Sequence, residues 1–118
     1  MTIGNHSVVV LAERERQVAK WGVQIHPDIS TLHGVDNSES ILADYEIEAN
    51  AFKEANDEIV ADGTMGWDTI LLEEVYEALA ESDPVKLREE LVQSAAVIFA
   101  WLDDLDRREA ERMAEIDV

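Results

Sequence analysis

The sequence contains no cysteine, so disulfide bonds, thiolate metal sites and a cysteine nucleophile are all excluded. Any metal site must therefore use oxygen ligands or the three histidines. Basic residues are scarce as well: 9 Lys and Arg stand against 27 Asp and Glu, which gives a formal net charge of −18. A surface this negative opposes the phosphates of nucleic acids and the lipids of an anionic membrane, so neither is expected as a partner.

Long hydrophobic runs are also missing. No stretch approaches the roughly 20 apolar residues that span a bilayer, and the N-terminus lacks the basic region of a secretion signal. We therefore expect a cytoplasmic protein. No glycine-rich phosphate loop and no Ser/His/Asp-type arrangement is present. The 118 residues, of which 47% are hydrophobic, are most simply a single domain over residues 1–118 with its own core.

Apolar residues at helical spacing predict four helices and no strand. The first runs from about Ser7, as its N-cap, to Trp21, where Gly22 stops it. The others are predicted over 38–61, 67–81 and 84–113, with Asp83 as the cap and Pro84 at the first position of the last. From about residue 107 the apolar pattern fades, which predicts a solvated or frayed C-terminal tail. The fold class is therefore all-α, a four-helix bundle.

Two carboxylate clusters interrupt the apolar stripes of the last two predicted helices. Glu74 and Glu77 lie three residues apart on one, and Glu90 and Gln93 three apart on the other. Residues at this spacing share a helix face, with Cβ atoms roughly 5–6 Å apart. Both clusters lie a similar distance from the tight turn between the helices, so they fall at the same height if the helices pack antiparallel. Facing each other, they would offer oxygen ligands to a hard divalent cation.

The helical register of these clusters has alternatives. Glu73 with Glu77, and Glu89 with Gln93, are also same-face pairs, and the sequence does not choose between the registers. Glutamate is common in helices, so a merely solvated face is the simpler explanation. A third interpretation takes the charge of −18 as the mark of an acidic protein-interaction module, although such a module should spread its carboxylates over exposed faces.

These residues resemble the signature of the all-α nucleoside triphosphate pyrophosphohydrolases, the superfamily of MazG-like and dimeric dUTPase-like proteins. That signature is Glu-x-x-Glu, a spacer, and Glu-x-x-Asp. Glu74-Val-Tyr-Glu77 matches the first half, and Glu90-Leu-Val-Gln93 matches the second half except that Gln replaces Asp. The resemblance extends more weakly to the first helix and its loop, and to Lys53, Asn56 and Asp57 in the second helix.

The resemblance implies a MazG-like bundle that forms a homodimer or a dimer of dimers through helix packing. It also implies a hydrolase that uses Mg²⁺, or Mn²⁺ as an alternative, to cleave a nucleoside triphosphate (NTP or dNTP) to the monophosphate and pyrophosphate. By analogy Glu74, Glu77 and Glu90 are metal ligands, and Gln93 takes the fourth ligand position. An amide oxygen brings no charge, so cation affinity should drop. A non-hydrolytic protein that binds or sequesters a nucleotide is therefore the alternative.

The same resemblance suggests catalytic residues. Glu73 or Glu77, if not fully committed to a cation, would orient or deprotonate the attacking water. Lys53 is the candidate for contacting phosphate, because an ammonium group is a suitable point-charge partner. Gln93 has a second interpretation as a buried amide that hydrogen-bonds to the carboxylates. Lys53, for its part, is equally consistent with a surface lysine among acidic neighbours.

Residues after the first predicted helix are candidates for binding the base. Trp21 offers a ring on which a base can stack, and Gln24 and His26 offer polar edges. Each has a simpler explanation, since Trp21 suits a core position and His26 precedes Pro27 in what is predicted to be an ordinary loop.

Overall fold

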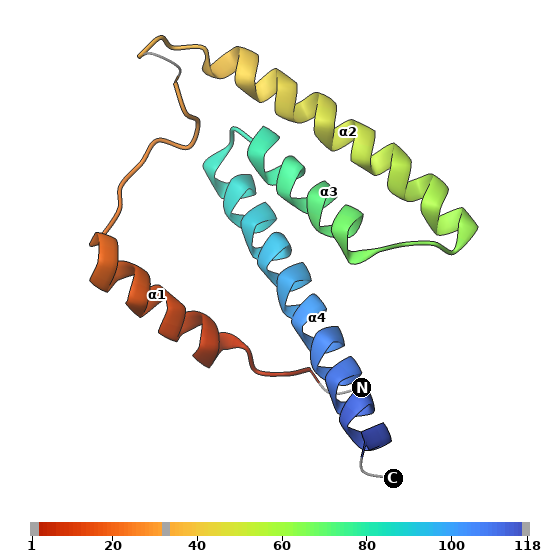
Figure 1. Ribbon diagram of the computed structural model, residues 1–118. Helices are drawn as coiled ribbons and strands as arrows, with labels where there is room; N and C mark the ends of the chain where they lie inside the picture. The colour runs from red at the N-terminus through yellow and green to blue at the C-terminus, as the bar shows by residue number, and fades with distance from the viewer. Residues whose placement is uncertain (1–2, 32–33, 117–118) are drawn as a thin grey trace. The chain divides into compact units, whose positions relative to one another are not determined.

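The computed structural model describes residues 3–31 and 34–116, and within them the protein is all-α (Figure 1). Its four helices are α1 (Ser7–Trp21), α2 (Ser38–Asp62), α3 (Trp67–Ala80) and α4 (Pro84–Ile116). The described residues contain no β-strand, as the sequence predicts. None of these helices combines the length and the apolar character needed to cross a membrane.

The helix ends lie where the sequence places its breaking residues. Gly22 and Gly63 follow α1 and α2 with φ of 72° and 73°, a left-handed region that glycine adopts without steric cost. At the start of α4 the Asp83 carboxylate accepts a hydrogen bond from the backbone N–H of Val85, at 3.0 Å. Pro84 occupies the first helical position, where its missing N–H is not needed. The predicted boundaries of the turn are confirmed.

One prediction about a helix end is wrong, and a second differs from the structure in part. Ser7 is the first helical residue rather than the cap of α1: His6 precedes the helix without a capping side chain, and Asn5 Oδ1 accepts the Ser7 N–H at 3.1 Å. The predicted tail from about residue 107 is exposed to solvent, as one of the two alternatives expects, but it stays helical to Ile116 rather than frayed. Its exposed end carries ion pairs between neighbouring turns, such as Arg112 with Glu109 at 2.6 Å, which favour the helical state.

The chain divides into two compact units. The central unit (Ile29–Ile98) contains α2, α3 and the first part of α4, and the terminal unit (Met1–Asp28 with Phe99–Val118) contains α1 and the rest of α4. In the central unit α2 packs along α3 (Figure 1). The two buried apolar residues of the described chain are small: Ala49 on α2 and Ala78 on α3. Phe52 stacks on Tyr76, with ring centroids 5.4 Å apart.

The expected apolar stripe of α4 is only partly covered. Leu87 and Leu102 are half-buried, but Leu91 and Ile98 keep 53% and 43% of their surface exposed, and Ala95 is exposed too. The 14-residue α3 is long enough to run beside Leu91, so the exposure of this residue shows that its face of α4 is one that α3 does not cover.

Candidate functional site

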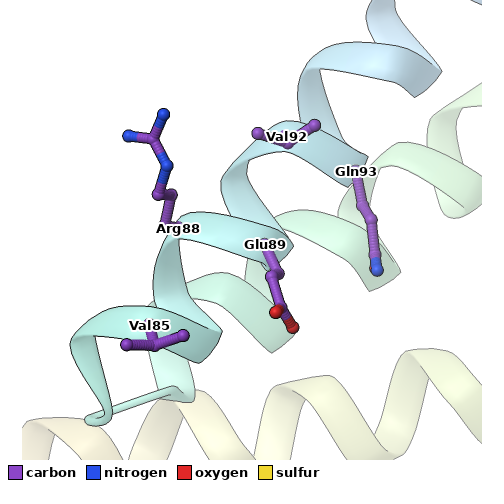
Figure 2. A pocket seen from close by; sticks show the side chains of 5 residues that line it. All are labelled: Val85, Arg88, Glu89, Val92 and Gln93. Carbon is purple, nitrogen blue, oxygen red and sulfur yellow. The ribbon is translucent and has the colours of Figure 1, made fainter.

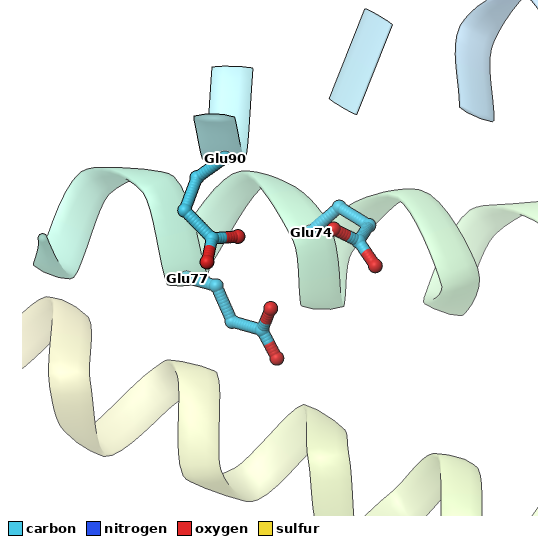
Figure 3. Close-up of side chains that lie close together, drawn as sticks. All are labelled: Glu74, Glu77 and Glu90. Atoms are coloured by element: carbon cyan, nitrogen blue, oxygen red, sulfur yellow. The ribbon is translucent and has the colours of Figure 1, made fainter. Parts of the chain in front are cut away.

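Three carboxylates converge at the junction of α3 and α4 in the central unit. Glu74 and Glu77 come from α3 and Glu90 comes from α4, and one oxygen of each lies within 4.8 Å of the others (Figure 3). All three side chains are half-buried. The spacing of three residues puts Glu74 and Glu77 on one face of α3, and the tight turn at Asp83 returns α4 beside it. The prediction that the two helices bring these carboxylates to the same height is confirmed for these three residues.

The electrostatics of this carboxylate cluster are unfavourable in the absence of a counter-charge. Burial raises the pKa of Glu74 above its ordinary value of 4.5, and repulsion by Glu90 and Glu73 raises it further. Burial likewise raises the pKa of Glu77, with further contributions from Glu74 and Glu90. Both shifts have the physical cause expected when like charges share a partly desolvated space. The cluster would thus gain stability from a bound cation or from protons.

Two oxygens of this cluster are buried without a hydrogen-bond partner. These are Glu74 Oε2 and Glu90 Oε2. A buried acceptor left unsatisfied costs free energy, on the order of 1–3 kcal/mol and more for a charged group. The donor set is thus oxygen only, negatively charged and incompletely satisfied, which is the set that hard divalent cations prefer.

Glu73, one residue before the cluster, has a different partner. Its Oε2 accepts a hydrogen bond from the side-chain N–H of Asn56 on α2, at 2.7 Å. The same amide nitrogen donates to the backbone carbonyl of Thr69 at 2.9 Å. Asn56 is 3% exposed, the most buried polar residue of the described chain. The structure therefore groups Glu74, and not Glu73, with Glu77 and Glu90.

Lys53 lies on α2, one helical turn before Asn56. Its side chain is exposed, and its charge opposes the upward shift of the Glu77 pKa. That influence places the Lys53 ammonium within electrostatic reach of the carboxylate cluster. The spacing of three residues accounts for this, because it puts Lys53 and Asn56 on the face of α2 that packs on α3.

Gln93 lies on an exposed part of α4. Together with Val85, Arg88, Glu89 and Val92 it lines a surface depression of about 430 Å³. Figure 2 shows the side chains of Glu89 and Gln93 extending from the same side of the helix. The structure thus places Gln93 beside Glu89, its same-face partner four residues earlier. Its predicted role as a fourth metal ligand stays a prediction.

The terminal unit brings the three base-binding candidates together. Trp21, Gln24 and His26 line one cavity of about 410 Å³ at the C-terminal end of α1, and Arg14 and Gln17 complete its wall. Trp21 is 57% exposed, so it is not a core residue of the chain. The Lys20 ammonium lies 4.9 Å from the centroid of the Trp21 ring. An aromatic ring flanked by amide and imidazole edges is chemically able to hold a planar heterocycle.

Three polar residues around these sites received no role from the sequence. Arg14 donates to the side-chain carbonyl of Gln17 at 2.9 Å, and both line the cavity of Trp21. Their positions, seven and four residues before Trp21, share one helix face, so helical spacing could have found them. Asn56 was marked only by the weak extension of the family resemblance to α2, without a role, and its burial follows from the packing of α2 on α3.

Comparison of the chain with protein-family models, with curated proteins and with solved structures gave no match. The candidate site therefore rests on the residues and geometry described above.

Proposed function

We propose that the protein is a divalent-cation-dependent nucleoside triphosphate pyrophosphohydrolase of the MazG-like, all-α superfamily. The observation that carries the proposal is the convergence of Glu74, Glu77 and Glu90 from two helices, with buried oxygens that lack a partner. Mutual repulsion in a partly desolvated space makes this arrangement costly for a protein that binds no cation there. The signature-like spacing of the same residues in the sequence supports the same function.

In this proposal Glu74, Glu77 and Glu90 hold Mg²⁺ or Mn²⁺, and Gln93 is the remaining candidate ligand. A cation bound there supplies charge neutralisation for the triphosphate and lowers the pKa of a coordinated water. Glu73 or Glu77 accepts the proton of the attacking water. Lys53 supplies a positive charge for the phosphates, in a region where carboxylates otherwise dominate.

The cavity of Trp21 is the proposed site for the base. The indole ring would stack on the heterocycle, while Gln24 and His26 would hydrogen-bond to its edges. The polar lining and the neighbouring Arg14 favour a base rich in hydrogen-bonding groups over an apolar ligand.

We also propose that the chain forms a homodimer or a dimer of dimers. In the central unit Leu91, Ile98, Val85 and Val92 form two exposed rows on α4, each with a spacing of seven residues. Exposed apolar rows at this spacing are typical of helices that pack on another helix. Light scattering at micromolar concentration should give at least the mass of a dimer, and a monomer would overturn this proposal.

The deciding test is pyrophosphate release from a panel of canonical and modified nucleoside triphosphates, with Mg²⁺, with Mn²⁺ and with EDTA. The proposal expects release that requires the cation and that is abolished in Glu74→Gln. Glu58→Gln, which removes one exposed carboxylate from α2, is the matched control and should behave like the wild type. Folded protein that releases nothing from any member of the panel would refute the hydrolase function.

A non-hydrolytic nucleotide-binding protein is the second candidate. The observation that favours it is the neutral Gln93, which leaves three carboxylates where the signature has four. In that case nucleotides should bind saturably in the presence of the cation, yet remain intact. Turnover by the wild-type protein would exclude it.

A further inference from the structure

The buried amide of Asn56 separates two adjacent glutamates that the sequence leaves equivalent. Its nitrogen donates one hydrogen bond to Glu73 Oε2 and another to the carbonyl of Thr69, so both of its N–H groups are used. Because both partners are acceptors, the orientation of the amide is fixed by chemistry. The contact joins α2 to the first turns of α3 and fixes where the Glu73 carboxylate lies.

The oxygen atom of the same amide indicates a role beyond packing. Asn56 Oδ1 is buried and has no hydrogen-bond partner. An amide retained at 3% exposure with an unsatisfied oxygen is costly, since an apolar side chain of similar size would avoid the penalty. Thr69 alone does not account for that cost. The charge-assisted hydrogen bond to the Glu73 carboxylate is the stronger of the two interactions.

From this geometry we infer that Asn56 is a positioning residue that holds the Glu73 carboxylate out of the cation site and reserves it for the attacking water. This inference rests on the proposed function and deepens it. It divides the acidic residues of α3 into two tasks: Glu74 and Glu77 bind the cation with Glu90, and Glu73 accepts the proton. Asn56 itself does not contact the reacting atoms in this scheme but acts through Glu73.

The division of tasks is tested first by titrating the metal-free protein with Mn²⁺, without any nucleotide. Glu73→Gln keeps an acceptor for the Asn56 amide and should change Mn²⁺ affinity by less than about threefold. Asn56→Ala should likewise stay within about threefold, whereas Glu74→Gln should weaken Mn²⁺ binding by at least about tenfold, since even outer-shell partners of a metal are worth 10–100-fold. Asn50→Ala, which removes an exposed amide from α2, is the matched control for Asn56→Ala.

Steady-state kinetics then test the role in water activation. Glu73→Gln should lower kcat by about 10²–10⁴-fold, the range for losing a general base. Asn56→Ala should lower kcat by about tenfold or more, with KM changed by less than about twofold, because the substrate contacts remain. Glu58→Gln and Asn50→Ala should match the wild type in both constants. If Asn56→Ala fails to fold, Asn56→Leu, which keeps the volume of the side chain but removes its amide, takes its place with the same expected fall in kcat.

Three outcomes would overturn the inference, and they differ from one another. Loss of Mn²⁺ binding in Glu73→Gln comparable to that in Glu74→Gln would make Glu73 a metal ligand. An unchanged kcat in a folded Asn56→Ala variant would reduce Asn56 to a packing residue. A wild-type protein that binds Mn²⁺ but hydrolyses no nucleotide would remove the assignment of Glu73 to water while leaving the metal site standing, whereas absence of Mn²⁺ binding would refute the proposed function itself.

Discussion

The central and terminal units of this protein use their charged residues in opposite ways. In the central unit, acidic groups are partly buried beside one another: Glu74, Glu77 and Glu90 repel, and two of their oxygens lack partners. In the terminal unit, charges are exposed and paired with opposite charges, as in Arg107 with Asp104 at 2.6 Å and with Glu111 at 2.8 Å. Paired surface charges add little stability but cost little. Clustered buried charges reduce stability, which makes the central unit the place where selection for function is the better explanation.

One polar contact in the terminal unit is less exposed than these surface ion pairs. Asp103 Oδ1 lies 2.6 Å from His6 Nε2 and accepts the backbone N–H of Gly4 at 3.0 Å. The His6 ring also meets Phe99 edge-on, with centroids 5.7 Å apart. Here the carboxylate is satisfied by its neighbours, in contrast to the carboxylates of the cluster. The hydrogen bond from His6, with that from Gly4, lowers the pKa of Asp103.

Among the variants considered, Glu74→Gln should most strongly reduce the contrast between the clustered charges of the central unit and the paired charges of the terminal unit. We expect it to raise the midpoint of thermal unfolding in EDTA at neutral pH, because it removes a repelled and partly buried charge. It should also abolish the additional stabilisation that Mg²⁺ or Mn²⁺ gives to the wild type. Differential scanning calorimetry with and without the cation measures both effects. A solvated-face role for Glu74 predicts no change in either, and retained cation stabilisation would refute the site.

Ala78→Leu should have the next largest effect. Ala78 on α3 is 2% exposed, so a larger side chain must displace its neighbours at a cost of about 1–3 kcal/mol in unfolding free energy. Ala110→Leu, at an exposed position of α4 in the terminal unit, should stay within about 0.5 kcal/mol. Urea unfolding followed by circular dichroism compares the two. Equal effects would mean that the two units are packed alike.

The pH dependence of stability should have opposite signs in the two units. The pKa values of Glu74 and Glu77 are raised in the folded state, so the native protein holds these protons more tightly than the unfolded chain. Their contribution to stability is therefore fully present below the unfolded value near 4.5 and is lost as pH rises through the folded pKa values. Asp103 has a lowered pKa, so its contribution is present above the unfolded value near 3.8 and is lost as pH falls.

The sign of this pH dependence is tested by measuring the stability of the metal-free protein between about pH 4 and pH 7. The double variant Glu74→Gln, Glu77→Gln should lose the part of the wild-type stability that declines with rising pH. Cation binding should show the reverse trend and weaken as pH falls, because the ligands must be deprotonated. An unaltered pH profile in the double variant would show that the two carboxylates do not titrate abnormally.

Asp103→Asn should give the smallest effect, confined to the terminal unit. The amide cannot replace the carboxylate as acceptor for both Gly4 and His6 with the same strength, so the amide hydrogen of Gly4 should exchange faster with solvent. Gly4→Ala should act alike, since its Cβ would lie 2.6 Å from Asp103 Oδ1. Hydrogen exchange followed by NMR provides the measurement. Unchanged exchange in both variants would mean that the contact contributes nothing to order at the N-terminal end.

Most helix boundaries follow from local backbone chemistry, which explains why they could be predicted from the sequence. Gly22, Gly63 and Pro84 act through their own backbone conformations, and these do not depend on distant packing. The convergence of Glu74 and Glu90 was predictable for a similar reason, since the tight turn and the constant rise of a helix fix the height of each residue. The exposure of Leu91 and Ile98 on α4 was not predictable, because periodicity reports a helix face and cannot report whether another element covers that face.

The sequence by itself determined four helices, most of their ends, and an acidic patch at one height on α3 and α4. Only the tertiary structure decided that Glu74 joins the cluster while Glu73 binds Asn56. Adjacent residues on a helix project about 100° apart, so the rotation of α3 about its own axis decides which of the two faces α4. That rotation is set by the packing of α2 on α3, where Phe52 stacks on Tyr76, and this contact involves residues distant in the sequence. The same packing buries Asn56, and for that reason its role could be seen only in the folded protein.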